Sequence, residues 1–229
     1  MKLEDREKSI QQIERQKTIK PKADLTSYLW TAKQKRKLIQ ISCIGSNFIG
    51  WDSPIYSYVK YEYLKNYWMK PKGAWTIVFS NPNEFPDPFD SLIYKVPIRN
   101  GKNSFICQDQ LIKNIYISCW TKCIESELHW NAYGRTDESV CLVSTPRKIM
   151  TNIYDFNIKN SYSFFFVGNV VYKDVSEVQR TITRTTLSQY LQHDYCVEQL
   201  FLKTKEHKNE KEIRFAFYDS PNSKRVFVS

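Results

Sequence analysis

The stretch N-P-N-E-F-P-D-P-F-D, residues Asn81 to Asp90, restricts the fold more than any other part of the sequence. Its three prolines fix the backbone φ angle and remove backbone donors, so neither an α-helix nor a central strand passes through it. Phe85 and Phe89 are large apolar groups that favour burial. The segment therefore predicts a rigid loop pinned to a core, which is either a well-anchored connector or a loop that carries a site.

The carboxylates of this loop are open to several interpretations. They are Glu84, Asp87 and Asp90. Carboxylates so close together can bind a metal, cap a helix, or accept hydrogen bonds from backbone groups. The position of Asp90 before Ser91-Leu92 favours a cap.

Size and composition fit one large domain, or one domain with an appendage. The chain has 229 residues, of which 41% are hydrophobic and 15% aromatic, which is enough for a core. No stretch approaches the roughly 18 uncharged apolar residues of a membrane-spanning helix. The first residues, MKLEDREKSIQQIERQK, contain no apolar signal segment. We therefore expect no membrane association and a cytoplasmic location.

Net charge and the positions of the cysteines and histidines restrict the binding partners and metal sites that we expect. A formal net charge of +10 favours a polyanion such as nucleic acid, because lysines near phosphates release counterions; it also suits plain solubility, since the lysines are spread along the chain. The six cysteines lie mostly in apolar runs, which is typical of reduced, buried thiols. The three histidines are far apart in sequence, so we expect no metal site of the zinc type.

Two regions are expected along the chain: a helical, charged appendage over residues 1–50 and a core domain over residues 51–229. Residues 1–22 are almost wholly polar, with charges of both signs at helical spacings. In the core, strands and helices mix without a βαβ rhythm, which predicts the α+β class with a mostly antiparallel mixed sheet and flanking helices. The absence of G-x-G-x-x-G and P-loop patterns argues against a Rossmann site or a nucleotide triphosphatase.

Individual elements follow from apolar runs and turn residues. Helices are expected over 125–133, from Pro146 onward and over 176–195, and strands over 75–79, 112–120, 140–143, 162–167, 170–172 and 213–218. Gly168-Asn169 predicts a hairpin turn between two strands. The turn 220–223 predicts that strand 213–218 pairs with 225–228.

The segment E-L-H-W-N-A-Y-G places aromatic groups along one flank of a helix. Trp130 and Tyr133 are three residues apart, and His129 and Tyr133 are four apart. Such a flank either stacks on a planar ring of a ligand or packs into the core.

The segment N-E-K-E-I-R-F-A-F-Y, residues 209–218, alternates as a strand does. One face carries Ile213, Phe215 and Phe217, and the other carries Glu210, Glu212 and Arg214. The charged face is either the solvent side or the lining of a cleft. In a cleft, Arg214 would keep one carboxylate ionised while the other bonds a substrate hydroxyl.

Taken in this order, these segments resemble a bacterial family catalogued only as a domain of unknown function. Its members carry F-N-D-P-F-D/E, M-W-x-x-Y and E-x-E-x-R patterns. The resemblance covers about residues 55–218, and its segments here are Val59-Lys60-Tyr61, Phe79 to Asp90, Ser118-Cys119-Trp120 with His129 to Tyr133, Val170 to Asp174, and Lys203 to Arg214. The chain departs from the pattern at Pro86, His129 and His207, where the family has Asn, Met and Trp.

The order of motifs is in turn similar to that of ADP-ribosyltransferases, especially bacterial toxins and phage-defence enzymes. This resemblance implies an ADP-ribosyltransferase-like fold with NAD as the cofactor. It implies that Glu212 is the catalytic acid/base or electrostatic partner, that Glu210 orients the nucleophile, and that Arg214 fixes the strand or a phosphate. The implied cofactor-binding residues are Lys60 and Tyr61 at the adenosine ribose, Ser80 as support, and Trp130 or Tyr133 stacked on nicotinamide.

The expected function is an NAD-consuming transferase that acts as a cytoplasmic toxin or anti-phage effector. Its target would be a nucleic acid or an acidic protein, and an antitoxin or regulatory protein would be a further partner. One alternative is a nuclease in which Asp87, Asp90, Glu210 and Glu212 gather around Mg²⁺. The other is a non-catalytic module that binds nucleic acid or a partner protein. The enzyme hypothesis requires that these distant segments meet around one hollow.

Overall fold

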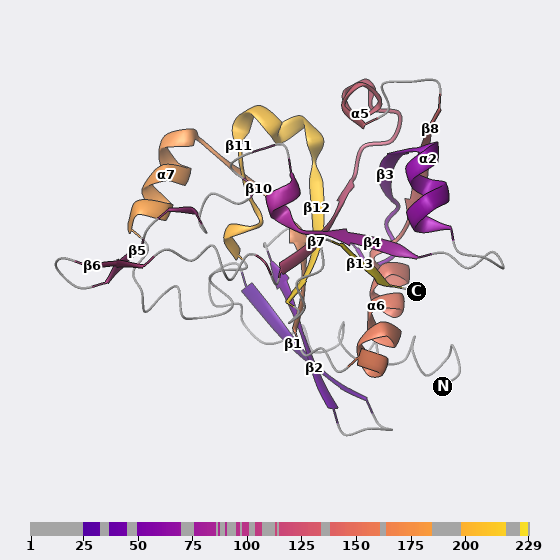
Figure 1. Cartoon of the computed structure of the whole chain (residues 1–229), viewed down its shortest axis with the longest axis horizontal. Helices are drawn as coiled ribbons and strands as arrows, with labels where there is room; N and C mark the ends of the chain where they lie inside the picture. Colours follow the sequence, from indigo (N-terminus) through magenta and orange to yellow (C-terminus); the bar gives the residue numbers. More distant parts are fainter. Residues whose placement is uncertain are drawn as a thin grey trace.

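Nine of the described strands form a single sheet in the computed structural model (Figure 1). The structure describes residues 25–32, 37–44, 50–69, 76–85, 87, 90, 95–96, 98–100, 104–106, 113, 115–133, 138–160, 164–184, 198–218 and 225–228. The strands of the sheet are β1 (Leu25–Ala32), β2 (Lys37–Ile44), β3 (Ile55–Lys60), β4 (Ile77–Ser80), β7 (Ile115–Thr121), β8 (Ser139–Ser144), β9 (Phe164–Asn169), β12 (Glu212–Tyr218) and β13 (Arg225–Val228).

Smaller elements surround this sheet. Two short pairs lie outside it: β5 (Ile98–Asn100) with β6 (Ser104–Ile106), and β10 (Val171–Lys173) with β11 (Leu202–Thr204). The helices are α2 (Tyr61–Tyr63), which continues as a π-helix η1 (Leu64–Trp68), α5 (Glu127–Tyr133), α6 (Pro146–Asn160) and α7 (Val175–Arg184). Two 3-10 helices, η3 (Pro82–Glu84) and η5 (Lys205–Glu210), complete the described elements.

The strand order of the sheet is β1-β2-β9-β12-β7-β3-β8, with β4 joined to β7 and β13 joined to β4. Only the pairing of β2 with β9 is parallel within this sheet. This confirms the expected α+β class with a mostly antiparallel mixed sheet. In Figure 1 the pair β1–β2 lies at the bottom of the view and α5 at the top.

The helical expectation for residues 1–50 is wrong over 25–32 and 37–44. These residues form β1 and β2, which pair with each other and join the central sheet through β9. Residues 37–44, K-L-I-Q-I-S-C-I, contain three isoleucines, and β-branched side chains suit a strand that pairs on both sides. Residues 1–24 lie outside the described part of the chain.

Two predicted hairpins are also wrong. Gly168 and Asn169 are the last residues of β9, and β10 pairs in parallel with β11. Gly168 stands opposite Arg214 of β12, so it occupies a strand position and not a turn. Strand β13 pairs with β4, whereas β12 pairs with β7 and β9.

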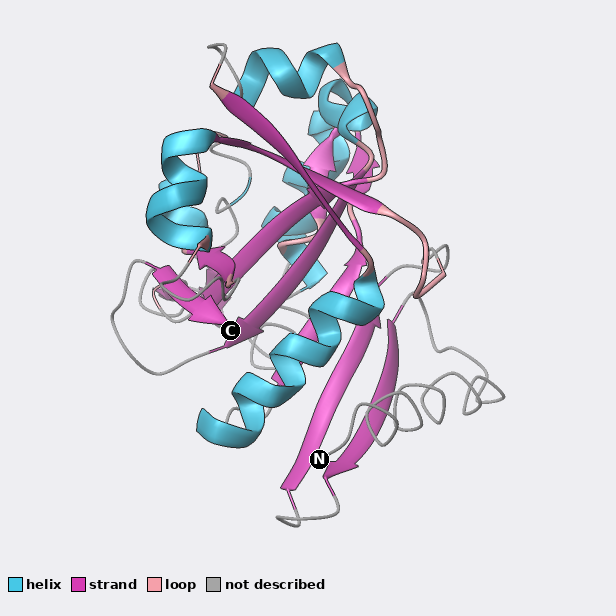
Figure 2. Ribbon diagram, turned by 90° about the vertical axis from the view of Figure 1, so that its right-hand side faces the viewer, coloured by secondary structure: helices cyan, strands magenta, loops and turns pink. Residues whose placement is uncertain are grey.

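The hydrophobic core covers one face of the sheet. The alternation of β12 correctly predicted that Ile213, Phe215 and Phe217 share this face, and all three are buried. Phe79 meets Phe217 edge to face, with ring centroids 4.9 Å apart. Helix α6, which begins at Pro146 as expected, buries Ile149, Met150 and Ile153 in the same core, and Figure 2 shows it lying across the strands.

Candidate functional site

The opposite face of β12 carries a buried network of charged side chains. Glu212 and Arg214 point to this face, opposite Thr121 and Cys119 of β7. Glu212 is 6% exposed and Arg214 is fully buried. Of the two faces considered for this strand, the charged one is therefore covered and does not face solvent.

Glu210 joins the network from outside strand β12. It ends the 3-10 helix η5, outside the strand in which the sequence placed it, because β12 begins only at Glu212. Lys211 between them has a left-handed backbone with φ of 44°, which turns the chain sharply. This turn of the backbone at Lys211 brings the carboxylates of Glu210 and Glu212 into the same network.

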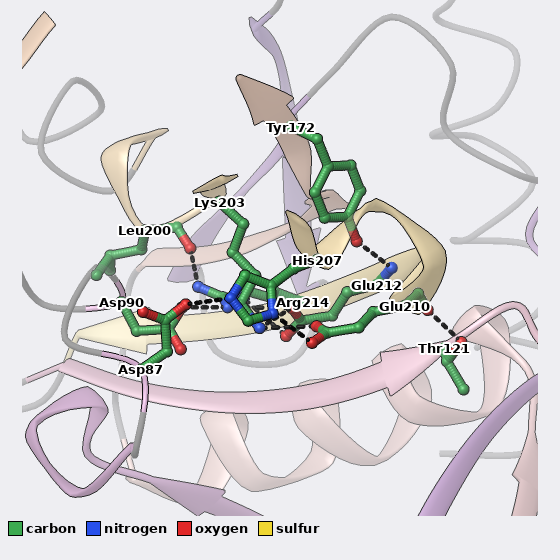
Figure 3. Close-up of polar contacts among 10 residues, drawn as sticks. All are labelled: Asp87, Asp90, Thr121, Tyr172, Leu200, Lys203, His207, Glu210, Glu212 and Arg214. Carbon is green, nitrogen blue, oxygen red and sulfur yellow. Dashed lines mark hydrogen bonds and ion pairs between the residues drawn. The ribbon is translucent and has the colours of Figure 1, made fainter. Parts of the chain in front are cut away.

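Arg214 lies at the centre of the network (Figure 3). Its Nε and Nη2 donate to the two carboxylate oxygens of Glu212 at 2.8 and 3.1 Å. Nη2 also donates to Asp90 of the proline loop, and Nη1 donates to the Leu200 carbonyl. A bidentate bond of this kind fixes both position and orientation of the Glu212 carboxylate.

Lys203 and His207 also contact these carboxylates. Lys203 Nζ lies 2.7 Å from Glu210 and 3.4 Å from Glu212, and its side chain is 6% exposed. His207 lies 2.9 Å from Glu210 and 3.5 Å from Asp87. Segments far apart in the sequence, the proline loop, β11, η5 and β12, are thereby joined through ion pairs.

These contacts set the charge of Glu212. Burial by itself would raise the pKa of this carboxyl group, but Arg214 and Lys203 outweigh it and hold the pKa at about 2. Burial acts to lower the pKa of Lys203, yet Glu212 and Asp90 raise it well above the usual lysine value. Glu212 is therefore an ionised carboxylate in a buried position at neutral pH.

A small cavity of about 70 Å³ opens beside Glu212. It lies where β3 and β7 diverge, since these strands pair in register only at Tyr56 and Thr121. Its lining includes residues from five elements: Tyr56 and Tyr58 of β3, Thr121 of β7, His129 of α5, Glu210 of η5 and Glu212 of β12. The acidic segment and His129 of α5 thus meet around one hollow, whereas no described residue of the proline loop lines it.

His129 closes the cavity from α5. Its ring stacks on Tyr58 with centroids 5.3 Å apart, and its Nδ1 lies 2.6 Å from the Ser126 hydroxyl. Burial lowers the pKa of His129, although Glu210 and Glu212 act in the opposite direction. The Tyr58 hydroxyl donates to the Cys123 carbonyl and accepts from the Ser126 amide, which ties the start of α5 to β3.

Of the expected cofactor-binding residues, Lys60, Tyr61, Ser80 and Trp130 are not part of the described lining of this cavity. Lys60, the last residue of β3, and Tyr61, the first residue of α2, are exposed, and Ser80 is half-buried at the end of β4. Trp130 meets Tyr58 edge to face at 4.7 Å. Tyr133 lies at the end of α5, and its side chain is outside the description.

Sequence reasoning missed several members of the site. Lys203 was noted only as the start of the motif segment that ends at Arg214, Tyr58 was assigned no role, and Asp90 was interpreted as a helix cap or a metal ligand. His129 was noted only as part of an aromatic flank. One signal pointed to Asp90, because a loop stiffened by prolines holds its last carboxylate in a fixed place.

The four carboxylates of the nuclease alternative are each paired with a cationic side chain or an imidazole. Arg214 bonds Glu212 and Asp90, and Lys203 bonds Glu210. Among the residues that the structure describes, no three His, Cys, Asp or Glu side chains are placed to hold a metal ion. A Mg²⁺ ion among these carboxylates would compete with Arg214 and Lys203.

Residues 129–215 match a family of unknown function. The description of the family is "Protein of unknown function (DUF2971)", and the match covers less than half of the chain. It runs from His129 to Phe215 and so includes Lys203, Glu210, Glu212 and Arg214. Neither a search of curated proteins nor a search of solved structures found a match to the chain. The matched region is consistent with the expected domain of unknown function.

Proposed function

We propose that the chain is an NAD-dependent ADP-ribosyltransferase whose reaction depends on Glu212. The observation that carries this proposal is that Glu212, buried and ionised, lines the same cavity as Glu210 and His129. A fixed carboxylate in a water-poor site is the group that a reaction with developing positive charge needs.

The chemistry resembles the cleavage of a glycoside. Breaking the bond between nicotinamide and ribose creates positive charge on the sugar, which a nearby carboxylate stabilises. Nicotinamide leaves with the bonding electrons, and a nucleophile of the target forms the new bond to the ribose carbon and loses its proton. In this proposal Glu212 stabilises the charge and Glu210 orients the nucleophile.

In this proposal Arg214 acts indirectly, by positioning the carboxylate of Glu212. It is fully buried and bonded to Glu212, Asp90 and Leu200, so it suits the task of holding the carboxylate in place. Of the two roles implied by the resemblance, fixing the strand fits this burial better than binding a phosphate. Arg214 is then a positioning residue.

The size of the cavity limits how NAD would bind. Ligand pockets usually measure roughly 300–1,000 Å³, so a cavity of about 70 Å³ suits only the reacting end of the molecule. The remainder would extend along β3, on which Lys60 follows Tyr58 on the same face at a spacing of about 7 Å. This spacing supports the proposed contact of Lys60 with the adenosine ribose, and Tyr61 follows Lys60 in the chain. Ser80 as support and Trp130 or Tyr133 as stacking residues belong to the same proposal.

The biological setting belongs to the same proposal. We infer a toxin or anti-phage effector of the cytoplasm, with nucleic acid as the target and an antitoxin or regulatory protein as a partner. The net charge of +10 supports a polyanionic target. No described helix is long and apolar enough to cross a membrane.

Release of nicotinamide from NAD⁺ by the purified protein, with DNA, RNA or bacterial extract as acceptor, tests the proposal. We expect release from the wild type and a loss of at least 100-fold in Glu212→Gln, the size typical of a missing electrostatic group. Glu206→Gln is the matched control, since Glu206 is exposed on the neighbouring η5. Equal release from Glu212→Gln, or none from wild type, would count against the transferase, and metal-dependent cleavage of nucleic acid would favour the nuclease.

A further inference from the structure

A second cavity, of about 340 Å³, lies on the core face of the sheet, away from the charged network. Strand alternation places it there: Trp120, which lines it, stands opposite Ile213, whereas Glu212 stands opposite the next residue, Thr121. Leu142 of β8 and Ile149 of α6 contribute apolar walls. This cavity therefore has a separate lining from the site of the proposed transferase, apart from the shared residue Trp120.

The lining of this cavity combines aromatic and aliphatic groups with uncharged polar side chains, which are Thr76, Cys141, Ser144 and Asn152. Trp68 and Trp120 meet edge to face with centroids 5.9 Å apart. None of the described lining residues is a lysine, arginine, histidine or carboxylic acid. Such a lining disfavours a charged ligand, because no group offsets the cost of removing its charge from water.

One buried donor in this lining lacks a partner. Trp68 is 7% exposed, and its indole Nε1 has no hydrogen-bond partner among the described residues. Two neighbouring polar groups are engaged: Trp120 Nε1 donates to the Ser118 hydroxyl at 3.1 Å, and the Thr76 hydroxyl donates to the Tyr67 carbonyl at 2.7 Å. A buried N–H group without an acceptor is rare in folded proteins and needs an explanation.

The backbone around Trp68 is unusual as well. Trp68 is the last residue of the π-helix Leu64–Trp68, and the amide of Met69 donates to the Leu64 carbonyl at 3.0 Å. Single π-helical turns are uncommon and are frequent at functional sites. The π-helical turn and the unpaired indole N–H thus both occur at Trp68, which lines the cavity.

We propose that this cavity binds a small, neutral, bicyclic heteroaromatic molecule whose ring nitrogen or carbonyl accepts a hydrogen bond from Trp68 Nε1. The size follows from the volume: a cavity of about 150 Å³ holds one benzene ring, and the cavity here, at about 340 Å³, has room for two fused rings. The acceptor follows from the free indole donor, and Ser144 and Asn152 add uncharged polar groups to the lining. The inference does not depend on the proposed transferase activity.

The test compares two probes of the same shape on the whole protein. Isoquinoline carries a ring nitrogen acceptor, whereas naphthalene has none. Protein labelled with ¹⁵N tryptophan gives indole N–H signals from its six tryptophans, and titration is done at a mildly alkaline pH where isoquinoline is uncharged. We expect isoquinoline to bind about fivefold more tightly than naphthalene, the usual worth of one hydrogen bond, and to shift the Trp68 signal downfield.

Two variants identify the donor. Trp68→Phe keeps an aromatic wall but removes the N–H, so it should lose the preference for isoquinoline. Tyr67→Phe is the matched control, because it removes a polar hydrogen from the adjacent residue of η1, which is not among the described lining; it should keep the preference. The proposal is overturned if neither probe binds wild type, if both bind equally, or if the preference survives in Trp68→Phe. The wild-type comparison alone decides the matter if Trp68→Phe fails to fold.

Discussion

Asp90 accepts a hydrogen bond from Arg214, although the two residues are 124 positions apart in the chain. Both are buried, and the contact joins the end of the proline-rich loop to the central strand β12. The rigid loop therefore has a structural purpose: it presents a carboxylate to a cation that also holds Glu212. Because fixed φ angles reduce the freedom of the unfolded loop, prolines lower the entropic cost of placing Asp90 there.

Removing Arg214 should destabilise the protein strongly. Arg214→Met leaves Glu212 and Asp90 without the cation that bonds both, and breaking a buried ion pair costs about 3–5 kcal/mol. Arg147→Met is the control, because Arg147 also bonds a carboxylate, Asp52, at 2.6 and 2.8 Å, but Asp52 is 70% exposed. The control should change the free energy of unfolding by less than about 1 kcal/mol. Urea denaturation measures both changes. Equal losses of unfolding free energy in the two variants would contradict the larger stabilising effect expected of the buried network.

Glu212 should make the fold sensitive to acid. The pKa of this group is about 2 in the folded protein and 4.5 as its ordinary value. A lowered folded-state pKa means that the stabilisation is complete above about pH 4.5 and is lost as pH falls toward 2, in total about 3 kcal/mol. Glu212→Gln should remove this part of the pH dependence, whereas Glu206→Gln should retain it.

Denaturation at a series of pH values measures this dependence, and a carboxyl NMR titration gives a second reading if Glu212→Gln is too unstable. A Glu212 carboxyl signal that titrates at its ordinary value would contradict the assignment of an ionised, buried carboxylate.

His129 should titrate below the ordinary histidine value. Burial lowers its pKa, and Glu210 and Glu212 partly oppose that effect. Replacing Glu210 by Gln removes one of these charges, so the pKa of His129 should fall further in Glu210→Gln. Imidazole NMR signals followed against pH provide the measurement. A pKa of His129 that is unchanged by this substitution would mean that the two side chains do not share the cavity electrostatically.

Some parts of this arrangement follow from the sequence and others depend on distant packing. The alternation at Ile213, Phe215 and Phe217 correctly gave the core face of β12, since burial of every second residue is a local pattern. The same alternation did not say that the face of Arg214 is covered, because Asp90 and Leu200, which cover it, come from other segments. Gly168 has the composition of a turn, and only its register opposite Arg214 explains why it lies in a strand.

Pairing between strands was the least predictable feature. The turn residues 220–223 suggested a hairpin, yet β13 pairs with β4 while both sides of β12 are occupied by β7 and β9. A turn sequence favours a change of direction but does not select the partner strand. The same holds for the site: Lys203 belongs to a short strand beside β10, and the motif segment that it shares with Glu212 does not show that the two side chains meet.

Replacing Glu210 and replacing Glu212 should affect NAD⁺ hydrolysis and transfer to the target differently if the proposed transferase is correct. Glu212→Gln removes the group that stabilises positive charge on the ribose, so it should reduce both hydrolysis of NAD⁺ and transfer to the target. Glu210→Gln should reduce transfer by at least about 100-fold, as is usual for a lost acid–base group, while nicotinamide release to water falls much less, since Glu210 acts on the incoming nucleophile. Glu210 is half-buried, with 16% of its side chain exposed, so its replacement should perturb the fold less than that of Glu212. Parallel assays of nicotinamide release and of ADP-ribose attached to nucleic acid separate the two roles. Equal losses of transfer and hydrolysis in Glu210→Gln would remove the assigned role of Glu210 and leave Glu212 as the group on which the reaction depends.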